Sequence, residues 1–394
     1  MPTIRGWAAL GAALALGTLW VAFGEELLFA VAAFLLLAVA LGTWYVRRRA
    51  PRVHTARRIT PTQLHDGDRA VVEITIASNR SLHEAQVEDV VHGLGAANFV
   101  AGRVEANVPM IARYEVLCRP RGVYKVGPAN VRVGDPLGLT ESGGPSGRTD
   151  RLVVYPAVEN LDGLPLVRGQ DPNMSTSRAN FSQMGGEDFF TLREYQRGDD
   201  LRRVHWPSSA KRDELMIRQL EMPWQSRALV LLDPRTSSYP TADAFEHAVR
   251  GAASAVRHLY QNGFSPTLWT GSTGATNVAS TEAYGMAMEE LAVVQTTQAI
   301  DLRTMVARMR RTGLSGGALV MVSGAPDDAE LAVYRLLGRD FLRTIVMAVA
   351  QRQNEAILQF QRAGVITVLT APGSRWAPAW REAMERSWST ATAG

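Results

Sequence analysis

The sequence of 394 residues contains a single cysteine, Cys118, so no disulfide can form within the chain. Cys118 ends an alternating run, Tyr114–Cys118, that is typical of a buried strand. This context predicts a small core residue and not a reactive thiol. The lack of disulfides fits a reducing compartment.

Complete motifs of the common hydrolase and nucleotide-binding classes are also missing. The chain has no Gly-x-Ser-x-Gly elbow, no Walker A sequence and no His-Glu-x-x-His. Its seven histidines lack metal-site spacing. We therefore predict no cofactor, and the motifs do not favour an enzyme.

A basic excess is absent from most of the chain. The net charge is +4, but residues 1–60 alone carry seven arginines against two glutamates, so the remaining 334 residues sum to −1. A nucleic-acid-binding protein is expected to carry its basic patch on the folded domain. We therefore predict no nucleic-acid partner.

Long hydrophobic runs are present, in contrast, at the N-terminus. Residues 7–23 and 27–46 are apolar, and Gly24, Glu25 and Glu26 separate them. A membrane-spanning helix needs about 20 apolar residues. The alternative for the first run is a signal peptide; the poor cleavage site and the immediate second run favour a retained two-helix hairpin.

The distribution of arginine predicts the orientation of this hairpin. Arg5 precedes the first run, and six arginines between positions 47 and 58 follow the second. Positive charge accumulates on the cytoplasmic side of a membrane, and it attracts anionic headgroups. We expect a two-pass protein of the cell membrane with cytoplasmic soluble domains and the bilayer as a partner.

The soluble part has two patterns. Between residues 63 and 156, alternating apolar residues with regular turns predict a β-sandwich, with a strand over 104–118 and a loop over 141–149. From 226 onward, strands alternate with helices, one of them expected over 296–309, which predicts a doubly wound α/β domain. The expected domains are a hairpin with its basic segment (1–60), a sandwich (61–158), a connecting segment (159–225) and the α/β domain (226–394).

The densest polar cluster lies in the connecting segment, between residues 192 and 212. Arg193, Arg202 and His205 would form a site for an anionic ligand or a partner, with Asp199 orienting them. The alternative is a buried salt-bridge network that clamps this segment onto the sheet. Pro207 disfavours helical geometry at the residue before it and predicts a break there.

Three motifs carry a family resemblance. The series Arg193-x-Tyr195-x-x-Gly198-Asp199-x-x-Arg202-x-x-His205-Trp206 resembles the signature of the bacterial family called domain of unknown function 58. Arg121-Gly122-x-Tyr124-x-x-Gly127-Pro128 and Asp135-Pro136-x-Gly138-Leu139 are similar to its upstream pattern. The resemblance implies a von Willebrand factor A-like C-terminal domain, a MoxR-type AAA+ ATPase as partner, a role in assembly or the cell envelope, and no enzyme activity.

Domains of the von Willebrand type often bind Mg²⁺ through Asp-x-Ser-x-Ser. Here Asp233 and Ser237 match, but Arg235 replaces the middle serine, and the later segment at 322–324 has no aspartate at the matching place. An arginine brings a positive charge and no ligand oxygen, so we predict no metal at this degenerate site. Arg235 is expected either to be a solvated loop residue or to receive a carboxylate from a partner.

Two functions follow from these observations. The first is a membrane-anchored adaptor or scaffold whose α/β domain engages a protein partner through residues 193–206. The alternative is an enzyme that acts on an envelope precursor or a phosphorylated ligand through the Arg193–His205 cluster. A protected pocket would favour the enzyme, and a flat charged face the adaptor.

Overall fold

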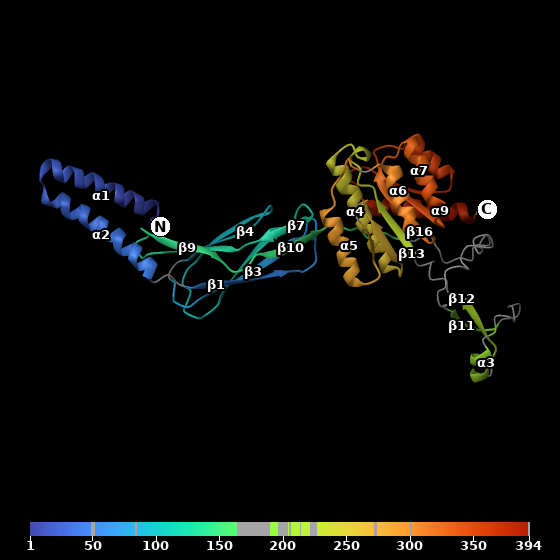
Figure 1. Cartoon of the computed structure of the whole chain (residues 1–394), viewed down its shortest axis with the longest axis horizontal. Helices are drawn as coiled ribbons and strands as arrows, with labels where there is room; N and C mark the ends of the chain where they lie inside the picture. The colour runs from blue at the N-terminus through green and yellow to red at the C-terminus, as the bar shows by residue number, and fades with distance from the viewer. Residues whose placement is uncertain are drawn as a thin grey trace. The chain divides into compact units, whose positions relative to one another are not determined.

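The computed structural model describes residues 1–48, 52–82, 85–163, 190–195, 204, 206–212, 214–220, 227–271, 274–299 and 301–392 (Figure 1). Its contacts divide the chain into two compact units, Met1–Pro156 and Ala157–Gly394.

The first unit begins with an antiparallel helical hairpin, α1 (Ile4–Phe23) and α2 (Glu26–Arg48). Both helices are long and apolar enough to cross a membrane, which confirms the prediction of two apolar N-terminal helices. α1 ends at Gly24, whose φ of 73° is a left-handed conformation that favours glycine. Trp20 and Phe29 lie with ring centroids 4.8 Å apart near this bend.

Two sheets follow in the first unit. The three-stranded sheet has the order β1-β3-β6 and contains β1 (Val53–Thr60), β3 (Arg69–Ser78) and β6 (Met110–Leu117). The seven-stranded sheet has the order β2-β10-β7-β4-β8-β9, with β5 paired to β4. Its strands are β2 (Leu64–His65), β4 (Ala85–Val91), β5 (Gly95–Ala101), β7 (Gly122–Val126), β8 (Ala129–Gly134), β9 (Glu141–Ser146) and β10 (Asp150–Tyr155).

Side chains from both sheets share their cores. Along β3, alternate residues such as Val72 are fully buried, because successive side chains of a strand point to opposite faces. Val72 packs in one cluster with Val126 of β7 and Val154 of β10, strands of the other sheet. The two sheets are therefore packed face to face as a sandwich.

Two local predictions for this unit are wrong. The strand predicted over 104–118 starts only at Met110, because Asn107 turns the chain with φ 62° and Val104 pairs instead with Leu82. The loop predicted over 141–149 contains β9, which pairs with β8. A Cβ atom at Gly143 would overlap the backbone of Val131 on β8, so glycine here permits close strand approach.

The second unit contains a small antiparallel ribbon and a larger sheet. The ribbon pairs β11 (Phe190–Glu194) with β12 (Met216–Leu220), and α3 (Trp206–Arg212) lies between them in the sequence. The larger sheet has the order β15-β14-β13-β16-β17-β18, in which only β15 is antiparallel. Its strands are β13 (Arg227–Leu232), β14 (Ser265–Trp269), β15 (Ala275–Asn277), β16 (Ala318–Gly324), β17 (Arg343–Val349) and β18 (Ile366–Thr370).

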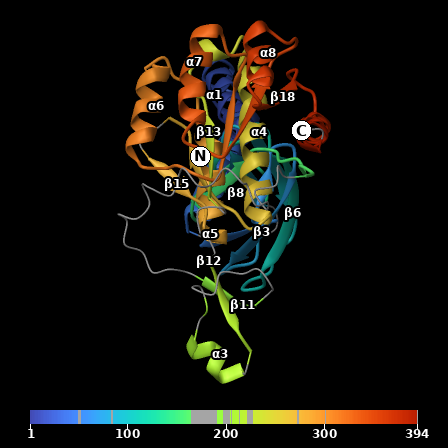
Figure 2. The ribbon, with the colours of Figure 1, turned by 90° about the vertical axis from the view of Figure 1, so that its right-hand side faces the viewer.

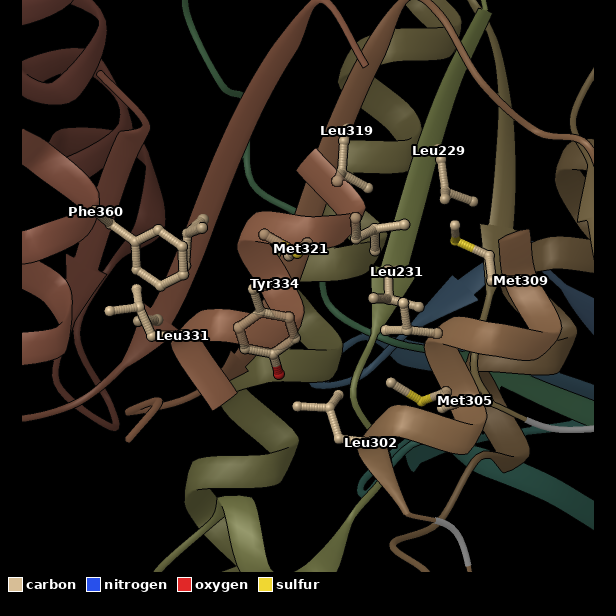
Figure 3. Close-up of a cluster of buried hydrophobic side chains, with 14 of the residues drawn as sticks. Leu229, Leu231, Leu302, Met305, Met309, Leu319, Met321, Leu331, Tyr334 and Phe360 are labelled. Atoms are coloured by element: carbon tan, nitrogen blue, oxygen red, sulfur yellow. The ribbon is translucent and has the colours of Figure 1, made fainter. Parts of the chain in front are cut away.

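Helices cover the larger sheet (Figure 2). They are η4 (Thr236–Ser238), α4 (Ala242–Gln261), α5 (Thr281–Val293), α6 (Leu302–Arg311), α7 (Asp328–Gly338), α8 (Glu355–Arg362) and α9 (Trp376–Thr392). Side chains of α6, α7 and α8 pack on Leu229 and Leu231 of β13 in one core (Figure 3). The intervening Val230 is also fully buried, and α4 contacts the same strand. The predicted mixed α/β body is thus confirmed.

One helix boundary is also wrong in the sequence interpretation. The helix predicted over 296–309 starts at Leu302, because Asp301 is its N-cap and its side chain accepts a hydrogen bond from the backbone N–H of Thr304. Earlier in the predicted range, Thr297 instead forms a bridge with Arg235, three residues after the end of β13.

Candidate functional site

The strand order of the larger sheet creates a switch point. β13 is followed in sequence by β14 on one side of it, and the chain then returns to place β16 on the other side. In open α/β sheets, ligands bind at the carboxyl ends of the strands where the order reverses. Here these ends are Asp233, directly after β13, and Ser323 on β16, and the Asp233 N–H donates to the Val322 carbonyl at 2.9 Å.

Asp233 and Arg235 form an ion pair at this switch point. Arg235 Nη2 lies 2.5 Å from Asp233 Oδ2, and its Nε lies 3.0 Å from Oδ1. The backbone N–H of Arg235 donates to the same carboxylate at 3.0 Å. Asp233 is 1% exposed and the Arg235 side chain 10%. Arg235 is therefore not the solvated loop residue that the sequence favoured.

Three more side chains complete this cluster, which we call the Arg235 network. Glu330 Oε1 of α7 lies 2.6 Å from Arg235 Nη2. The hydroxyls of Ser238 and Tyr334 donate to Asp233 Oδ2 at 2.8 and 3.0 Å. Two carboxylates around one guanidinium leave a net negative charge, and both carboxylates come from this chain itself.

The start of α7 fixes the position of Glu330. Asp327 is the N-cap of α7, and its side chain accepts from the Glu330 N–H while Glu330 Oε2 accepts from the Asp327 N–H at 3.1 Å. This reciprocal capping box restricts the glutamate rotamer. The other oxygen of Glu330 is then directed to Arg235.

The electrostatics of the network keep its groups in one protonation state. Burial alone would lower the pKa of Arg235, but the hydrogen bond and charge of Asp233 raise this pKa above its ordinary value. Burial first, and then the charge of Asp233, raise the pKa of Tyr239 and of Tyr334 well above the usual range. Both phenols thus remain donors, and Tyr239 donates to the Asp233 carbonyl at 2.7 Å.

A divalent cation does not fit among these residues. Mg²⁺ requires several oxygen ligands near 2.1 Å in octahedral geometry, whereas here the carboxylate oxygen faces a guanidinium nitrogen at 2.5 Å. Ser237, one of the two residues matching the metal motif, is exposed, and its neighbour Ser238 contacts Asp233 instead. Within the described parts of the chain, no group of three or more His, Cys, Asp or Glu side chains could hold a metal ion.

Sequence reasoning missed Glu330, Tyr239 and Tyr334 as neighbours of Asp233. The series Asp327-x-x-Glu330 before an apolar run is a visible capping-box signal, but it says nothing of what the outer carboxylate oxygen contacts. The two tyrosines come from separate elements, and only the fold brings them together.

Three residues of the sequence signature, Arg193, Tyr195 and Trp206, are described by the structure and belong to the small ribbon and to α3. Arg193 is on β11 opposite Ile217 of β12, and the Tyr195 N–H donates to the Leu215 carbonyl at 2.8 Å. Trp206 begins α3. The remaining predicted residues, Gly198, Asp199, Arg202 and His205, lie outside the described residues.

The ribbon has its own small buried centre and one exposed aromatic residue. Met216 and Ser209 are buried, and the Met216 N–H donates to Ser209 Oγ at 2.9 Å. Trp206, at the start of α3, is 67% exposed. An exposed tryptophan on a structured element is the kind of residue that anchors protein interfaces.

Comparison with known proteins identifies the class. The family model described as "Protein of unknown function DUF58" matches residues 191–325. Residues 191–325 therefore match the DUF58 family, as the motifs indicated. The matched stretch begins in β11 and ends just after β16, so it includes the ribbon and the Asp233–Arg235 pair.

A curated relative supports this assignment. The uncharacterized protein YeaD of Bacillus subtilis is 31% identical over 246 residues, which cover 60% of this chain and 59% of the relative. The chain thus spans about 59% of the length of the relative that it matches.

Similarity to solved structures is low. The CARDB domain of the PF1109 protein from Pyrococcus furiosus has a TM-score of 0.21 and 13% identity, covering 26% of this chain and 88% of that domain. Spo0M of Bacillus subtilis has a TM-score of 0.17 and 9% identity, covering 26% of this chain and 49% of that protein.

Proposed function

We propose that this protein is a membrane-anchored adaptor. Its hairpin crosses the cell membrane, and its soluble units lie on the cytoplasmic side, where the ribbon formed by β11, α3 and β12 engages a protein partner. The resemblance to DUF58 proteins directs attention to a MoxR-type AAA+ ATPase as that partner, in assembly or at the cell envelope.

The exposure of Trp206 carries this proposal. A large aromatic side chain that is 67% exposed is costly to leave in water, because apolar burial stabilises by about 25 cal/mol per Å². It lies in the family signature, next to the predicted site residues. Binding to a partner would cover it.

The Arg235 network supports an adaptor over an enzyme. Its guanidinium is paired with the carboxylates of Asp233 and Glu330, so these charges are already engaged within the chain. A cavity of about 320 Å³ in the same unit lies instead at the amino ends of the strands, lined by Arg227, Ser265, Ser315 and their neighbours. We further propose that the α/β domain is von Willebrand factor A-like, with Arg235 as a fixed charge where relatives hold a metal.

Crosslinking in native membranes tests the adaptor role. The wild type is compared with Trp206→Ala and with Arg193→Ala/Asp199→Ala, and the captured proteins are identified by mass spectrometry. Met286→Ala on α5 is the matched control, since Met286 is 56% exposed but lies outside the ribbon.

We expect the AAA+ ATPase to be captured by the wild type and the control and lost from the folded Trp206 variant. If all variants capture the same proteins, the ribbon is not the contact. A ligand-binding or enzymatic role for residues 193–205, on an envelope precursor or a phosphorylated molecule, then takes precedence.

A further inference from the structure

The turn between β8 and β9, residues 135–140, contacts the base of the hairpin within the first unit. Two hydrogen bonds to this turn fix the position of Thr3, the N-cap of α1. Its N–H donates to the Leu139 carbonyl at 2.9 Å, and its hydroxyl donates to the Gly138 carbonyl at 2.7 Å. Pro2 forms a bridge with Thr140, and the Glu141 N–H donates to the Met1 carbonyl. The first residues of the chain thus extend the β9 edge before α1 begins.

Both helices of the hairpin present a glycine to the turn. A Cβ atom at Gly6 of α1 would overlap the Leu139 carbonyl oxygen. At Gly42 of α2, a Cβ atom would lie 2.7 Å from Asp135 Oδ2 and 3.1 Å from Thr140 Oγ1. Both glycines are buried. Only residues without a side chain allow the turn to seat against both helices at once.

Asp135 holds the turn in one shape. Its carboxylate, 8% exposed, accepts from the backbone N–H groups of Leu137, Leu139 and Thr140 and from the Thr140 hydroxyl. Burial acts to raise the pKa of Asp135, but these hydrogen bonds outweigh burial and lower the pKa. The Asp-Pro-x-Gly-Leu motif, first noted for its family resemblance, is therefore a rigid seat for the hairpin.

The level of this seat along the helices places it at the edge of the bilayer. Gly6 lies next to the start of the first apolar run, and Gly42 lies four residues before the end of the second, at Val46. A helix rises about 1.5 Å per residue, so the seat is roughly 6 Å inside the apolar end of α2. The seat thus lies between the apolar start of α1 and a level about 6 Å inside the apolar end of α2, at the boundary between the hydrocarbon core and the headgroups.

Leu137 is at the tip of the seat and is 64% exposed. We infer that the β8–β9 turn is a membrane-interface element, which seats the hairpin base and places Leu137 among the lipid headgroups and upper acyl chains. The inference rests on the proposed membrane anchoring of the hairpin. Nearby basic and aromatic groups suit the same layer: Arg48 lies over the Trp44 ring at 5.9 Å, and Arg5 lies beside Gly138.

The single cysteine makes a depth measurement practical. In a Cys118→Ala background, Leu137→Cys is labelled with an environment-sensitive fluorophore, and the full chain is reconstituted in phosphatidylcholine–phosphatidylglycerol vesicles. Nitroxides attached to the lipid headgroup or deep in the acyl chain then quench the fluorescence of the label, and the stronger of the two quenchers gives the depth of the label in the bilayer. Cys118 is fully buried, so labelling in the unchanged background is a second route if Cys118→Ala does not fold.

Two further sites calibrate the result. Leu117→Cys is the matched control, because Leu117 is 56% exposed and lies at the opposite end of the sandwich strands, paired with Arg69 at the start of β3. Leu36→Cys reports on the middle of α2. We expect shallow nitroxides to reduce the fluorescence at 137 on the order of twofold or more, deep nitroxides to act on 36, and neither to act on 117.

The outcomes separate the two claims. If the label at position 36 is quenched but the label at position 137 behaves like the one at position 117, the membrane anchor stands and the interface inference is overturned. If 36 is also unquenched, the membrane anchoring itself fails. A Gly42→Leu variant tests the seat: it should reduce quenching at 137 and leave 36 unchanged, while Gly17→Leu, where nothing lies within 4 Å, should alter neither. Unchanged quenching at 137 in Gly42→Leu would reject the seat.

Discussion

Each unit of this protein contains a buried arginine–aspartate pair whose aspartate also accepts a tyrosine hydroxyl. In the sandwich, Arg57 donates to Asp89 at 2.7 and 2.8 Å, and the Tyr114 hydroxyl lies 2.7 Å from Asp89 Oδ2. In the α/β unit, Arg235 and Tyr334 surround Asp233 in the same way. The chemistry is alike, but the two pairs occupy different places in their folds.

The two pairs differ in how far apart their two members lie in the sequence. Arg57 on β1 and Asp89 on β4 belong to different sheets, and their side chains are 1% and 0% exposed. Asp233 and Arg235 are two residues apart at a sheet edge, with the arginine 10% exposed. The first pair therefore ties two sheets together across the core, whereas the second fills a site at the surface of a switch point. A buried ion pair alone does not show which of these roles it has.

The largest effect is expected from Asp89→Ala. The variant leaves the buried Arg57 guanidinium with the longer contact to Asp150 Oδ2 at 3.5 Å, and the loss of one partner of a buried pair costs about 3 kcal/mol or more. Urea unfolding followed by a label on the sandwich measures the loss. The neighbouring Glu88→Ala is the control, because Glu88 and its partner Arg132 are 36% and 44% exposed and such pairs contribute about 0–1 kcal/mol. Equal losses in the two variants would remove the idea of a clamp.

The next largest effect is expected from acid, which should lower the stability of the α/β unit more than that of the sandwich. His247 of α4 is 3% exposed, stacks on Trp376 at 4.8 Å and contacts Thr370 Oγ1 at 2.9 Å. Burial, aided by the charge of Arg250 and opposed by Glu159, lowers the pKa of His247 to about 4. The pKa of an unfolded histidine is near 6.5. Between pH 6.5 and about 4, His247 is therefore protonated in the unfolded state but not in the folded state. The stability that is present above pH 6.5 is lost as the pH falls through this range.

The expected loss is about 3 kcal/mol for the α/β unit between pH 6.5 and 4. In the first unit, the pKa values of Arg57, Tyr114 and Cys118 are raised and that of Asp135 is lowered below its ordinary value, so none of these four groups titrates in this window. Denaturant unfolding at several pH values, with a probe in each unit, measures the difference. His247→Gln should flatten the slope of the second unit; an unchanged slope would assign the acid sensitivity to other groups.

Arg235→Ser should cost less, about 2 kcal/mol, because Glu330 is 16% exposed and water can reach the carboxylates left behind. The variant restores an oxygen at position 235 beside Asp233, Ser238 and Glu330, a set that suits Mg²⁺. We expect Mg²⁺ to recover part of the lost thermal stability. Arg57→Ser should lose more and recover nothing, and recovery in both would mean that Mg²⁺ acts nonspecifically.

Much of the architecture of the two units was visible in the sequence, but the contacts of the two buried pairs were not. Periodicity predicted the two apolar helices and the alternation of strands and helices, because burial of one face imposes a repeat on the residues. The sequence drew attention to Asp233 and Arg235 because they belong to one local motif, but it did not predict that they pair with each other. The Arg57–Asp89 pair and the contact of Glu330 with Arg235 depend on strand order, and no residue spacing encodes them. The same holds for Gly6 and Gly42, whose role appears only when the turn at 135–140 is folded against them.

The smallest and sharpest test compares two hydroxyl deletions. Among the described residues, Asp89 accepts from the Arg57 guanidinium and the Tyr114 hydroxyl. Asp233 accepts from the Arg235 guanidinium and backbone, from Ser238 and from Tyr334. A hydrogen bond to a charged group contributes about 1.5–3 kcal/mol, but its loss is smaller where other donors remain.

We therefore expect Tyr114→Phe to cost about 2 kcal/mol and Tyr334→Phe about 1 kcal/mol. Tyr260→Phe, which removes an exposed contact to Thr281, should stay near zero. Combining Tyr334→Phe with Arg235→Ser should raise the cost of losing the hydroxyl, because Asp233 then has fewer donors. Equal costs for Tyr334→Phe in both backgrounds would mean that the Arg235 network does not act as a unit. The Asp233–Arg235 pair would then differ from the Arg57–Asp89 pair in geometry alone.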